Sequence, residues 1–469
     1  MADSQRVPSE TLSLRVVAVA AVAALGGLLF GYDSSVVNGA VDAVQGRYGL
    51  SGAATGFTVS VALLGAMVGA WCAGSLADRF GRVRTMIFAA VLFFASSLGS
   101  AFCFGVVDLI VWRAIGGLGV GIASVIAPAY IAEIAPARVR GRLGSLQQLA
   151  IVTGIFLALL TNAFIANGAG GAARPGWLGM EAWRWMFLVE IVPAVAYGVL
   201  AFTLPESPRY LVGRGDLQRA KAVLRDVVGL KDEASMDRKI ADIERTTESE
   251  KRQSLRDLVG PRLGLLPVVW VGILLSVFQQ FVGINVIFYY STTLWQSVGF
   301  SESDSFTVSV ITSVTNIAVT IVAILLVDKV GRKPLLLAGS AGMAAALTLM
   351  AVAFSQSRVV DGAVILPGAW GTVALVAANL FVVAFGATWG PVVWVLLGEM
   401  FPNRIRAIAL SVAAAAQWLA NFVVTTTFPV LSEVGLSLAY GLYALFAVLS
   451  FVFVWRQVKE TKGRELEDM

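Results

Sequence analysis

Three ionisable side chains interrupt long apolar stretches of the sequence. Asp33 lies in the first such stretch, Arg113 in the fourth and Glu190 in the sixth. A charge at the centre of a membrane-spanning helix costs at least about 2–3 kcal/mol, so such a residue is expected to be functional or paired. By residue count all three fall in the outer half of the bilayer, and a contact among them is plausible. For Glu190, a buried ion pair that only fixes helix packing is an equally good explanation.

Asp33 is the strongest candidate for a proton carrier. The chain contains no histidine, which excludes histidine proton relays and histidine-ligated metals. A carboxyl that alternately gains and loses an arginine partner also changes its affinity for protons. A contact between Asp33 and Arg113 that forms and breaks would therefore bind and release a proton in each cycle.

Neutral amides form a second group of candidate residues. An amide both donates and accepts hydrogen bonds, which suits an uncharged ligand rich in hydroxyls. Amides can also link helices, at about 1 kcal/mol each, and we favour that explanation for Gln147 and Asn421 taken alone. The amides in apolar stretches are Gln147, Gln148, Gln279, Gln280, Asn285, Asn316, Gln417 and Asn421.

Two positions would break helices beside these amides. Gly283 would loosen the helix next to Asn285, and Gly390–Pro391 would bend a later helix. Trp389 and Trp418 supply flat aromatic faces, suited to the apolar C–H side of a pyranose ring. The sequence therefore predicts a pocket for a hydroxyl-rich ring.

Charged motifs occur in pairs along the chain: GSLADRFGR (74–82) with VDKVGRK (327–333), EIAPARVRG (133–141) with EMFPNRIRA (399–407), and PESPRYL (205–211) with KETKGREL (459–466). Their acids can pair with arginines or lie at helix N-termini. They either stabilise the fold or act as latches that hold one face closed and break when it opens. Because the motifs recur symmetrically, we favour latches. The predicted latch residues are Asp78, Arg79, Arg82, Glu133, Arg140, Glu206, Arg209, Asp328, Arg332, Glu399, Arg406 and Glu460.

Membrane helices must carry all of these residues. Hydrophobic residues make up 57% and charged residues 14% of the 469-residue chain, whereas about 25% of the residues in soluble domains are charged. A spanning helix needs about 20 mostly apolar residues. Stretches of this kind lie near 14–38, 54–77, 84–103, 106–132, 143–166, 184–204, 266–296, 305–328, 334–354, 370–398, 405–431 and 436–456.

A long polar segment divides these stretches six and six. We predict an N-terminal bundle over 14–204, a linker over 205–265 and a C-terminal bundle over 266–457. The linker should form short surface helices near 216–228 and 236–245, with charges on most faces. It lacks a GxxxxGK[ST] phosphate loop, so it cannot drive transport by nucleotide hydrolysis. Parallel repeats of this kind place a substrate site near the midplane, between the halves.

One glycine-rich segment has a sequence like that of a nucleotide-binding loop. GGLGVG (116–121) resembles a dinucleotide-binding loop, but it lies within the fourth apolar stretch and follows no strand. Gly117 and Gly121 have the spacing of small residues that let two membrane helices approach closely. Helix packing is therefore the preferred explanation.

The basic residues predict the orientation. Alternate loops on one side collect Arg82, Arg84, Arg138, Arg140, Arg142, the segment 205–265, Lys329, Arg332, Lys333, Arg404 and Arg406. The other side has little beyond Arg47, Arg174 and Arg358. Positive charge marks the cytoplasmic side, so both termini and the linker are predicted to be cytoplasmic. The net charge of +5 then needs no nucleic-acid partner.

Together the paired motifs resemble the major facilitator superfamily, and PESPR with ETKG resembles its sugar porter family. The similarity covers essentially the whole chain, although Lys459 stands where the last motif commonly has proline. The strings SVFQQFVGINV, WGPVVWV and GEMFPNRIRA look closest to bacterial glucose/proton permeases. LFGYDSS (29–35) resembles proton-coupled members, whereas passive carriers tend to have a neutral residue at the position of Asp33.

The resemblance also implies a set of sugar contacts. At Ile155, bacterial xylose symporters have a second glutamine, whereas passive glucose carriers have an apolar residue; this favours a hexose. The implied sugar-binding residues are Phe30, Gln148, Ile155, Gln279, Gln280, Asn285, Tyr289, Asn316, Trp389, Gln417 and Trp418.

We therefore predict an all-α integral membrane protein of twelve helices in two pseudo-symmetric halves. It should couple the uptake of a monosaccharide, D-glucose, to protons through Asp33, Arg113 and Glu190. An uncoupled facilitator or a pentose or inositol symporter stays open as an alternative, and a membrane sugar sensor is a remoter one. We expect no enzymatic activity, cofactor, metal or nucleic-acid partner. We expect a monomer in the cell membrane of a bacterium.

Overall fold

A computed structural model describes residues 14–136, 140–230, 232–251, 255–260, 264–360, 363–402 and 405–461. Twelve stretches of these residues are helical, long and apolar enough to cross a membrane, which confirms the predicted number. They are Leu14–Gly39, Gly52–Phe80, Arg82–Ala101, Val106–Ile134, Leu143–Ala169, Ala182–Ala201, Pro267–Tyr289, Glu302–Leu326, Arg332–Ser355, Trp370–Met400, Ile408–Val434 and Leu436–Gln457.

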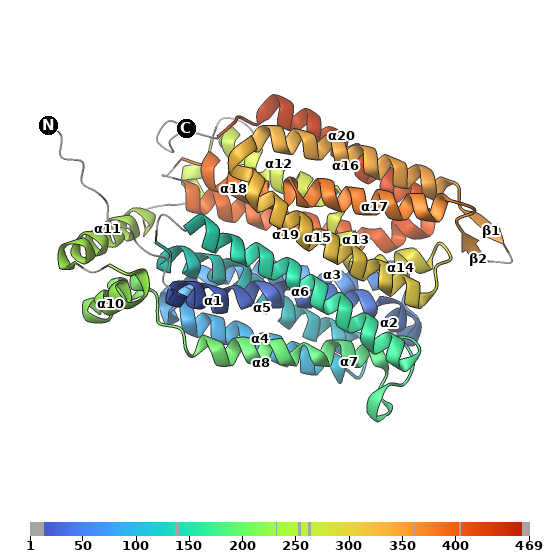
Figure 1. The fold of residues 1–469 in the computed structure, drawn as a ribbon, viewed down its shortest axis with the longest axis horizontal. Coiled ribbons are helices and arrows are strands. Elements are labelled where there is room, and N and C mark those ends of the chain that lie inside the picture. The colour runs from blue at the N-terminus through green and yellow to red at the C-terminus, as the bar shows by residue number, and fades with distance from the viewer. Residues whose placement is uncertain are drawn as a thin grey trace.

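The first six spans form one bundle, drawn from blue to green in Figure 1. Its helices are α1 (Leu14–Val36) with the 3₁₀ turn Val37–Gly39, α2 (Val41–Tyr48), α3 (Gly52–Phe80), α4 (Arg82–Ala101), α5 (Val106–Ile134), α6 (Arg140–Ala169), α7 (Ala182–Val189) and α8 (Ile191–Ala201).

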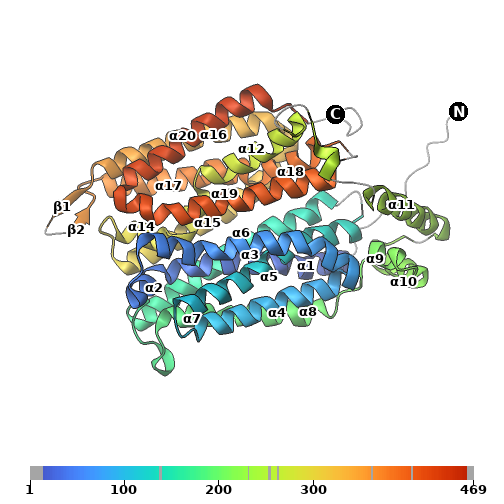
Figure 2. The ribbon, with the colours of Figure 1, turned by 180° about the vertical axis from the view of Figure 1, so that it is seen from behind.

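The last six spans form the second bundle, drawn from yellow to red (Figures 1 and 2). Its elements are α12 (Pro267–Phe281), α13 (Ile284–Tyr289), α14 (Ser291–Gln296), α15 (Glu302–Val330), α16 (Arg332–Ser355), the strands β1 (Arg358–Val360) and β2 (Ala363–Ile365), α17 (Trp370–Gly386), α18 (Trp389–Met400), α19 (Arg406–Val434) and α20 (Leu436–Gln457). The two strands pair antiparallel.

Short helices connect the bundles at one end of the molecule. They are α9 (Pro208–Gly213), α10 (Leu217–Val223) with a π turn over Leu224–Val228, and α11 (Glu233–Lys251). The last two overlap the stretches 216–228 and 236–245. They bury a small apolar cluster of their own, including Leu211, Leu224 and Met236. We call this end the linker face and the opposite end the far face; α1 begins and α20 ends at the linker face (Figure 1).

Glycines allow the closest helix contacts. A Cβ atom on Gly117 or Gly121 of α5 would lie 2.0 or 2.1 Å from a backbone carbonyl oxygen of α3, so these helices meet backbone to backbone as predicted. The same holds for Gly31 of α1 and Gly154 of α6, where a Cβ would lie 2.0 Å from Ile151 O and Leu28 O. No side chain therefore fits between the paired helices at these four positions.

Three spans are broken along their length. The seventh span breaks at Gly283, which has φ 81°, and the tenth breaks between Gly386 and Trp389; both breaks were predicted. The sixth span also breaks, at Glu190 between α7 and α8. Pro193 explains this break, because it lacks the N–H that would bond to the carbonyl of Val189.

The two bundles contact each other closely at the far face. Ser60 of α3 and Thr426 of α19 share a hydrogen bond of 2.6 Å, and Glu302 Oε1 accepts one of 2.8 Å from the backbone N of Ala172. One apolar cluster also joins the far ends of both bundles, with Val36 and Val59 from the first and Ile284 and Phe428 from the second. The molecule is therefore closed at the far face.

Candidate functional site

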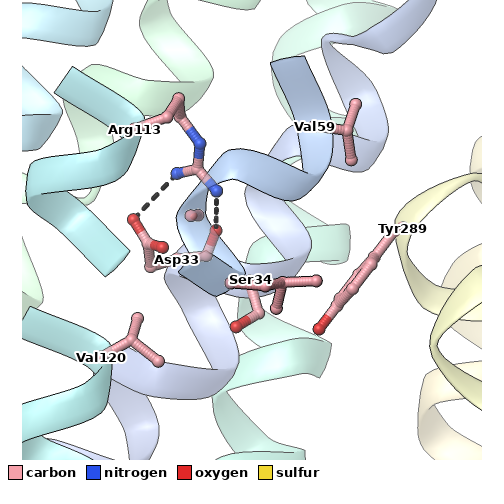
Figure 3. Close-up of a pocket in the computed structure, with 8 residues that line it drawn as sticks. Asp33, Ser34, Val59, Arg113, Val120 and Tyr289 are labelled. Carbon is pink, nitrogen blue, oxygen red and sulfur yellow. Dashed lines mark hydrogen bonds and ion pairs between the residues drawn. The ribbon is translucent and has the colours of Figure 1, made fainter. Parts of the chain in front are cut away.

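Asp33 and Arg113 form a fully buried ion pair (Figure 3). Arg113 Nη1 donates to Asp33 Oδ1 at 2.9 Å and Nη2 donates to the backbone oxygen of Asp33 at 3.0 Å. The exposed fractions of the two side chains are 2% for Arg113 and 1% for Asp33. The guanidinium also lies 5.6 Å from the centre of the Phe187 ring. The contact that the charges predicted is thus present.

Glu190 lies beside this pair without a well-formed hydrogen bond. Its side chain is buried, and neither carboxylate oxygen has a hydrogen-bond partner among the described residues. Asp33 and Arg113 are close enough to interact with it electrostatically. Two carboxyls therefore lie near one guanidinium that binds only Asp33, and these three groups are neutral together only when one carboxyl holds a proton.

A small cavity connects the ion pair to the second bundle. It measures about 10 Å³, which is room for roughly one water molecule. Its lining includes Asp33, Ser34 and Arg113 from the first bundle and Tyr289 from the second. Figure 3 shows the Tyr289 hydroxyl directed toward Ser34.

Three predicted sugar-binding amides lie together at the break of the seventh span. Asn285 Nδ2 donates to Gln280 Oε1 at 2.6 Å, and Gln280 Nε2 donates to Gln279 Oε1 at 3.5 Å. Gln279 Nε2 reaches the carbonyl oxygens of Trp389 and Gly390, at 3.0 and 3.3 Å, where the tenth span is broken. The two helix breaks thus meet at the amide cluster.

The predicted aromatic residues fall into two places. Phe30 and Trp418 face each other across the two bundles, with ring centres 5.6 Å apart. Trp389 is fully buried, and its indole N–H donates to Leu336 O and Ser340 Oγ of α16. In this far-face-closed structure, the indole N–H of Trp389 is therefore bound to α16, and only the backbone oxygen of Trp389 contacts the amide cluster.

Within the part of the chain that the structure describes, no hydrogen bond joins the remaining pocket residues to the amide cluster. Gln148 and Ile155 are half-buried on α6, Gln417 is half-buried on α19, and Asn316 is buried on α15. Among the described residues, Gln417 Oε1 is buried with no partner. Gln147, which we expected to link helices, likewise has no partner for either amide atom within the described part of the chain.

The charged motifs of the first bundle form one network at the linker face. Arg82 binds both oxygens of Glu133, at 3.0 and 3.1 Å, and Asp78 at 3.1 Å. Glu206 accepts from the backbone N–H groups of Arg82 and Val83 at the start of α4. Burial raises the pKa of Glu206, although these backbone hydrogen bonds oppose the rise. The acids thus bind the loop arginine and a helix N-terminus, two of the predicted partners.

The second bundle repeats this network. Arg332 binds Glu399 at 2.7 and 3.1 Å, and Glu460 accepts from the backbone N–H groups of Arg332 and Lys333. Thr461 donates to Glu399 at 2.6 Å, as Ser207 does to Glu133 in the first bundle. Both networks join helices of the same bundle.

The other predicted latch residues are less informative. Arg79 is exposed and its carbonyl accepts from Arg214, and Arg406 Nε donates to Phe401 O. Arg209 lies at the start of α9. The side chains of Arg140 and Asp328 lie outside the described part of the structure.

Two residues that form contacts at the far face were not predicted from the sequence. Asn38 is fully buried; its Nδ2 donates to Phe288 O at 2.9 Å, and its own carbonyl accepts from Thr292 Oγ1 at 2.7 Å. Asp42 accepts from Thr293 and Gln296 at 2.8 and 3.0 Å. An asparagine inside the apolar string SSVVNGAV (34–41) was an available signal for Asn38.

Asp42 has an unusual environment for a carboxyl at the end of a span. Burial raises its pKa; the hydrogen bond from Thr293 opposes this rise, and the nearby charge of Glu302 adds to it. The far-face contact therefore holds a carboxyl that is partly removed from water.

Comparison with known proteins defines the class to which this fold and site belong. The family model described as "Sugar (and other) transporter" matches residues 19–469. The chain therefore belongs to the sugar transporter family.

The similar proteins include sugar transporters from bacteria. The chain is 57% identical over 456 residues to the "Glucose transport protein" of Synechocystis sp., with 97% of each chain covered. It is 38% identical over 487 residues to the "D-xylose-proton symporter" of Escherichia coli K12, covering 97% of this chain and 95% of the relative.

Solved structures of the major facilitator superfamily share the fold. The xylose transporter XylE from E. coli, in a partially occluded inward open conformation, matches with a TM-score of 0.83 and 37% identity over 97% of this chain and 100% of that one. XylE bound to 6-bromo-6-deoxy-D-glucose matches with a TM-score of 0.80 and 37% identity, covering 97% and 98%.

Proposed function

We propose that the protein imports a monosaccharide, D-glucose, together with protons, by alternating access. Asp33 takes up a proton from the far side while the sugar binds among the amides and aromatic rings between the bundles. The far face then closes, the linker face opens, and both are released. The linker face is cytoplasmic in this proposal, as the basic loops indicate, and one chain acts as a monomer.

The observation that carries the proposal is the charge count at Asp33. Two buried carboxyls, Asp33 and Glu190, face a single arginine. A buried site with one uncompensated charge is costly, and one proton removes that charge. The site therefore favours one bound proton, and in the proposed cycle Asp33 is the carboxyl that gains and loses it.

Glucose is the proposed substrate for two reasons. The relative with 57% identity is named a glucose transport protein, and Ile155 supplies no extra amide for a pentose. Relatives named as xylose symporters at 38% identity make D-xylose the competitor to test. Competition of labelled glucose uptake by a panel of sugars, in liposomes, separates these substrates.

The test of coupling is the substitution Asp33→Asn. The neutral amide cannot cycle a proton, so we expect loss of sugar accumulation against a gradient, while sugar exchange across the membrane is retained. The measurement is uptake and counterflow in liposomes that contain the purified protein under an imposed pH gradient.

The matched control is Asp108→Asn, the same change near the start of α5, where Asp108 accepts from the backbone of Phe104. This variant should accumulate sugar normally. Accumulation by Asp33→Asn would overturn the coupling proposal, and absence of sugar-induced alkalinisation in the unsubstituted protein would favour an uncoupled facilitator.

A further inference from the structure

The far end of α1 is held by residues of the proton site. The helix ends at Val36 and continues as the 3₁₀ turn Val37–Gly39. Arg113 binds the carboxylate of Asp33 and also its backbone oxygen, in the last turn of α1. One guanidinium therefore fixes both the side chain and the main chain at this point.

The residues that follow Asp33 reach the second bundle directly. Asn38, five residues further on, lies in the 3₁₀ turn and is fully buried. Its side chain binds the carbonyl of Phe288 in α13, and its carbonyl binds the hydroxyl of Thr292 in α14. At a rise of about 1.5–2 Å per residue, five residues separate the ion pair from this contact by only about 10 Å.

The segment that Asn38 holds belongs to the proposed sugar pocket. α13 and α14 follow the break at Gly283 and contain Asn285 and Tyr289. A contact from α1 to these helices therefore closes the far face directly over the amide cluster. Asn162 fixes the other side of the same turn, because its Nδ2 donates to Val36 O at 2.9 Å.

The surroundings of Arg113 allow a small displacement from Asp33. Arg113 lines the cavity of about 10 Å³, and its guanidinium contacts the Phe187 ring at 5.6 Å while it binds Asp33, so this cation–π contact remains when the ion pair weakens. A proton on Asp33 neutralises the carboxylate and weakens the bond from Arg113 Nη1, so that the main chain of the turn is held by the bond to the backbone oxygen alone.

We infer that Asn38 is a positioning residue that transmits the state of the Asp33–Arg113 contact to the far face. With the ion pair formed, the last turn of α1 is fixed and Asn38 keeps α13 and α14 closed. When the pair breaks, this turn loosens and the far face opens. This inference rests on the proposed proton coupling.

The consequence for coupling is a barrier to proton leak. A carrier that has bound a proton but no sugar keeps its far face open, so it does not carry the proton inward. Sugar bound to Gln280 and Asn285 draws the seventh span inward from the second bundle and restores closure. Proton and sugar must then cross together.

The test is a double-mutant cycle on Asp33 and Asn38 in the full-length protein in liposomes. Spin labels at Gly46→Cys and Ser355→Cys, with Cys72 and Cys103 replaced by serine, report the distance between the far ends of the bundles. Gly46 and Ser355 are exposed and lie on opposite bundles. No sugar or pH gradient is needed.

Asp33→Asn should raise the far-face-open population several-fold when Asn38 is present. Asn38→Ala should open the far face by itself, and adding Asp33→Asn should then change nothing further. The matched control is Thr426→Val, which removes the far-face bond between Ser60 and Thr426; it should weaken closure and leave the effect of Asp33→Asn intact.

An Asp33→Asn effect of full size in the Asn38→Ala background would overturn the inference, as would no effect when Asn38 is present. If Asn38→Ala misfolds or leaves no closed population, Thr292→Val removes only one of the two bonds and should reduce the Asp33→Asn effect. Failure of the proposed function appears separately, as loss of proton-driven accumulation by the unsubstituted protein.

Discussion

Asn285 has two roles in the proposed sugar pocket. It can bind a sugar hydroxyl, and it orients Gln280 through a hydrogen bond of 2.6 Å. Both amides come from the short stretch that the break at Gly283 loosens. The effect of losing one side chain should therefore exceed that of one hydrogen bond.

For Asn285→Ala we expect sugar affinity to fall about tenfold or more, because one lost hydrogen bond of about 1–1.5 kcal/mol gives roughly five- to tenfold and the orientation of Gln280 is lost as well. Equilibrium binding of labelled glucose to the purified protein measures this. Asn379→Ala is the matched control, since Asn379 bonds to Leu375 within its own helix and to Thr315. Equal losses in the two variants would contradict a pocket role for Asn285.

At the scale of single residues, isolated charges in apolar stretches were the most informative feature for predicting the site. The cost of isolated charges in an apolar stretch predicted the Asp33–Arg113 contact. Asn38 was missed because a single amide does not reveal its partner, and that partner, the carbonyl of Phe288, lies 250 residues away. The orientation of the Trp389 side chain could not be predicted from the sequence either, because an indole packs well on either side of a helix.

At the scale of helices, glycine and proline explain most of the geometry. The breaks at Gly283 and before Gly390–Pro391 were predictable because these residues weaken or interrupt helical hydrogen bonding. The break at Glu190 was not predicted, although Pro193 signals it. Most span ends could be predicted to within three residues from apolar length. The seventh span was predicted to end at 296 but ends at Tyr289, because α14 follows as a separate helix.

In the linker-face network, Arg82 binds two acids that differ in burial, so their contributions to stability can be compared. Glu133 and Arg82 are nearly buried, with side chains 11% and 10% exposed, whereas Asp78 is 76% exposed. Removing one partner of a buried pair costs about 3–5 kcal/mol, but an exposed pair contributes under about 1 kcal/mol. Burial, and not the number of charges, should decide stability here.

We therefore expect Glu133→Gln to lower the midpoint of thermal unfolding in detergent clearly, and Asp78→Asn to change it little. Glu399→Gln should repeat the first result in the second bundle, because Glu399 binds Arg332 in the same way. Similar midpoints for Glu133→Gln and Asp78→Asn would show that the buried network does not stabilise the bundle.

At the scale of the whole molecule, the sequence predicted two six-helix halves. It did not predict the conformation of the structure, in which the halves contact each other at the far face. Alternating access buries the same residues differently in each state, so composition and periodicity carry no preference between them. The far-face contacts of Ser60, Asn38 and Asp42 identify the state only once the bundles are placed together.

Closure of the far face depends on a close approach at Gly56. A Cβ atom there would lie 2.2 Å from the carbonyl oxygen of Thr426, and a backbone atom cannot move aside. We expect Gly56→Trp to hold the far face open, with sugar binding retained and sugar exchange lost. Counterflow in liposomes, with binding measured in parallel, checks this.

Gly46→Trp is the matched control, because Gly46 is exposed on α2 with nothing within 4 Å of a Cβ. It should exchange sugar normally. Exchange by Gly56→Trp at the rate of the unsubstituted protein would mean that transport does not require these helices to meet.

The two carboxyls that share one arginine also determine how voltage acts on the proposed cycle. With Glu190 ionised throughout, the site carries one negative charge when Asp33 is empty and none when it is loaded. An inside-negative potential, which contributes about 2.3 kcal/mol per charge at roughly 100 mV, then drives the empty carrier outward. With Glu190 protonated throughout, the loaded site is positive and is driven inward instead. The protonation state of Glu190 therefore decides which step of the cycle the membrane potential drives: the return of the empty carrier or the inward movement of the loaded one.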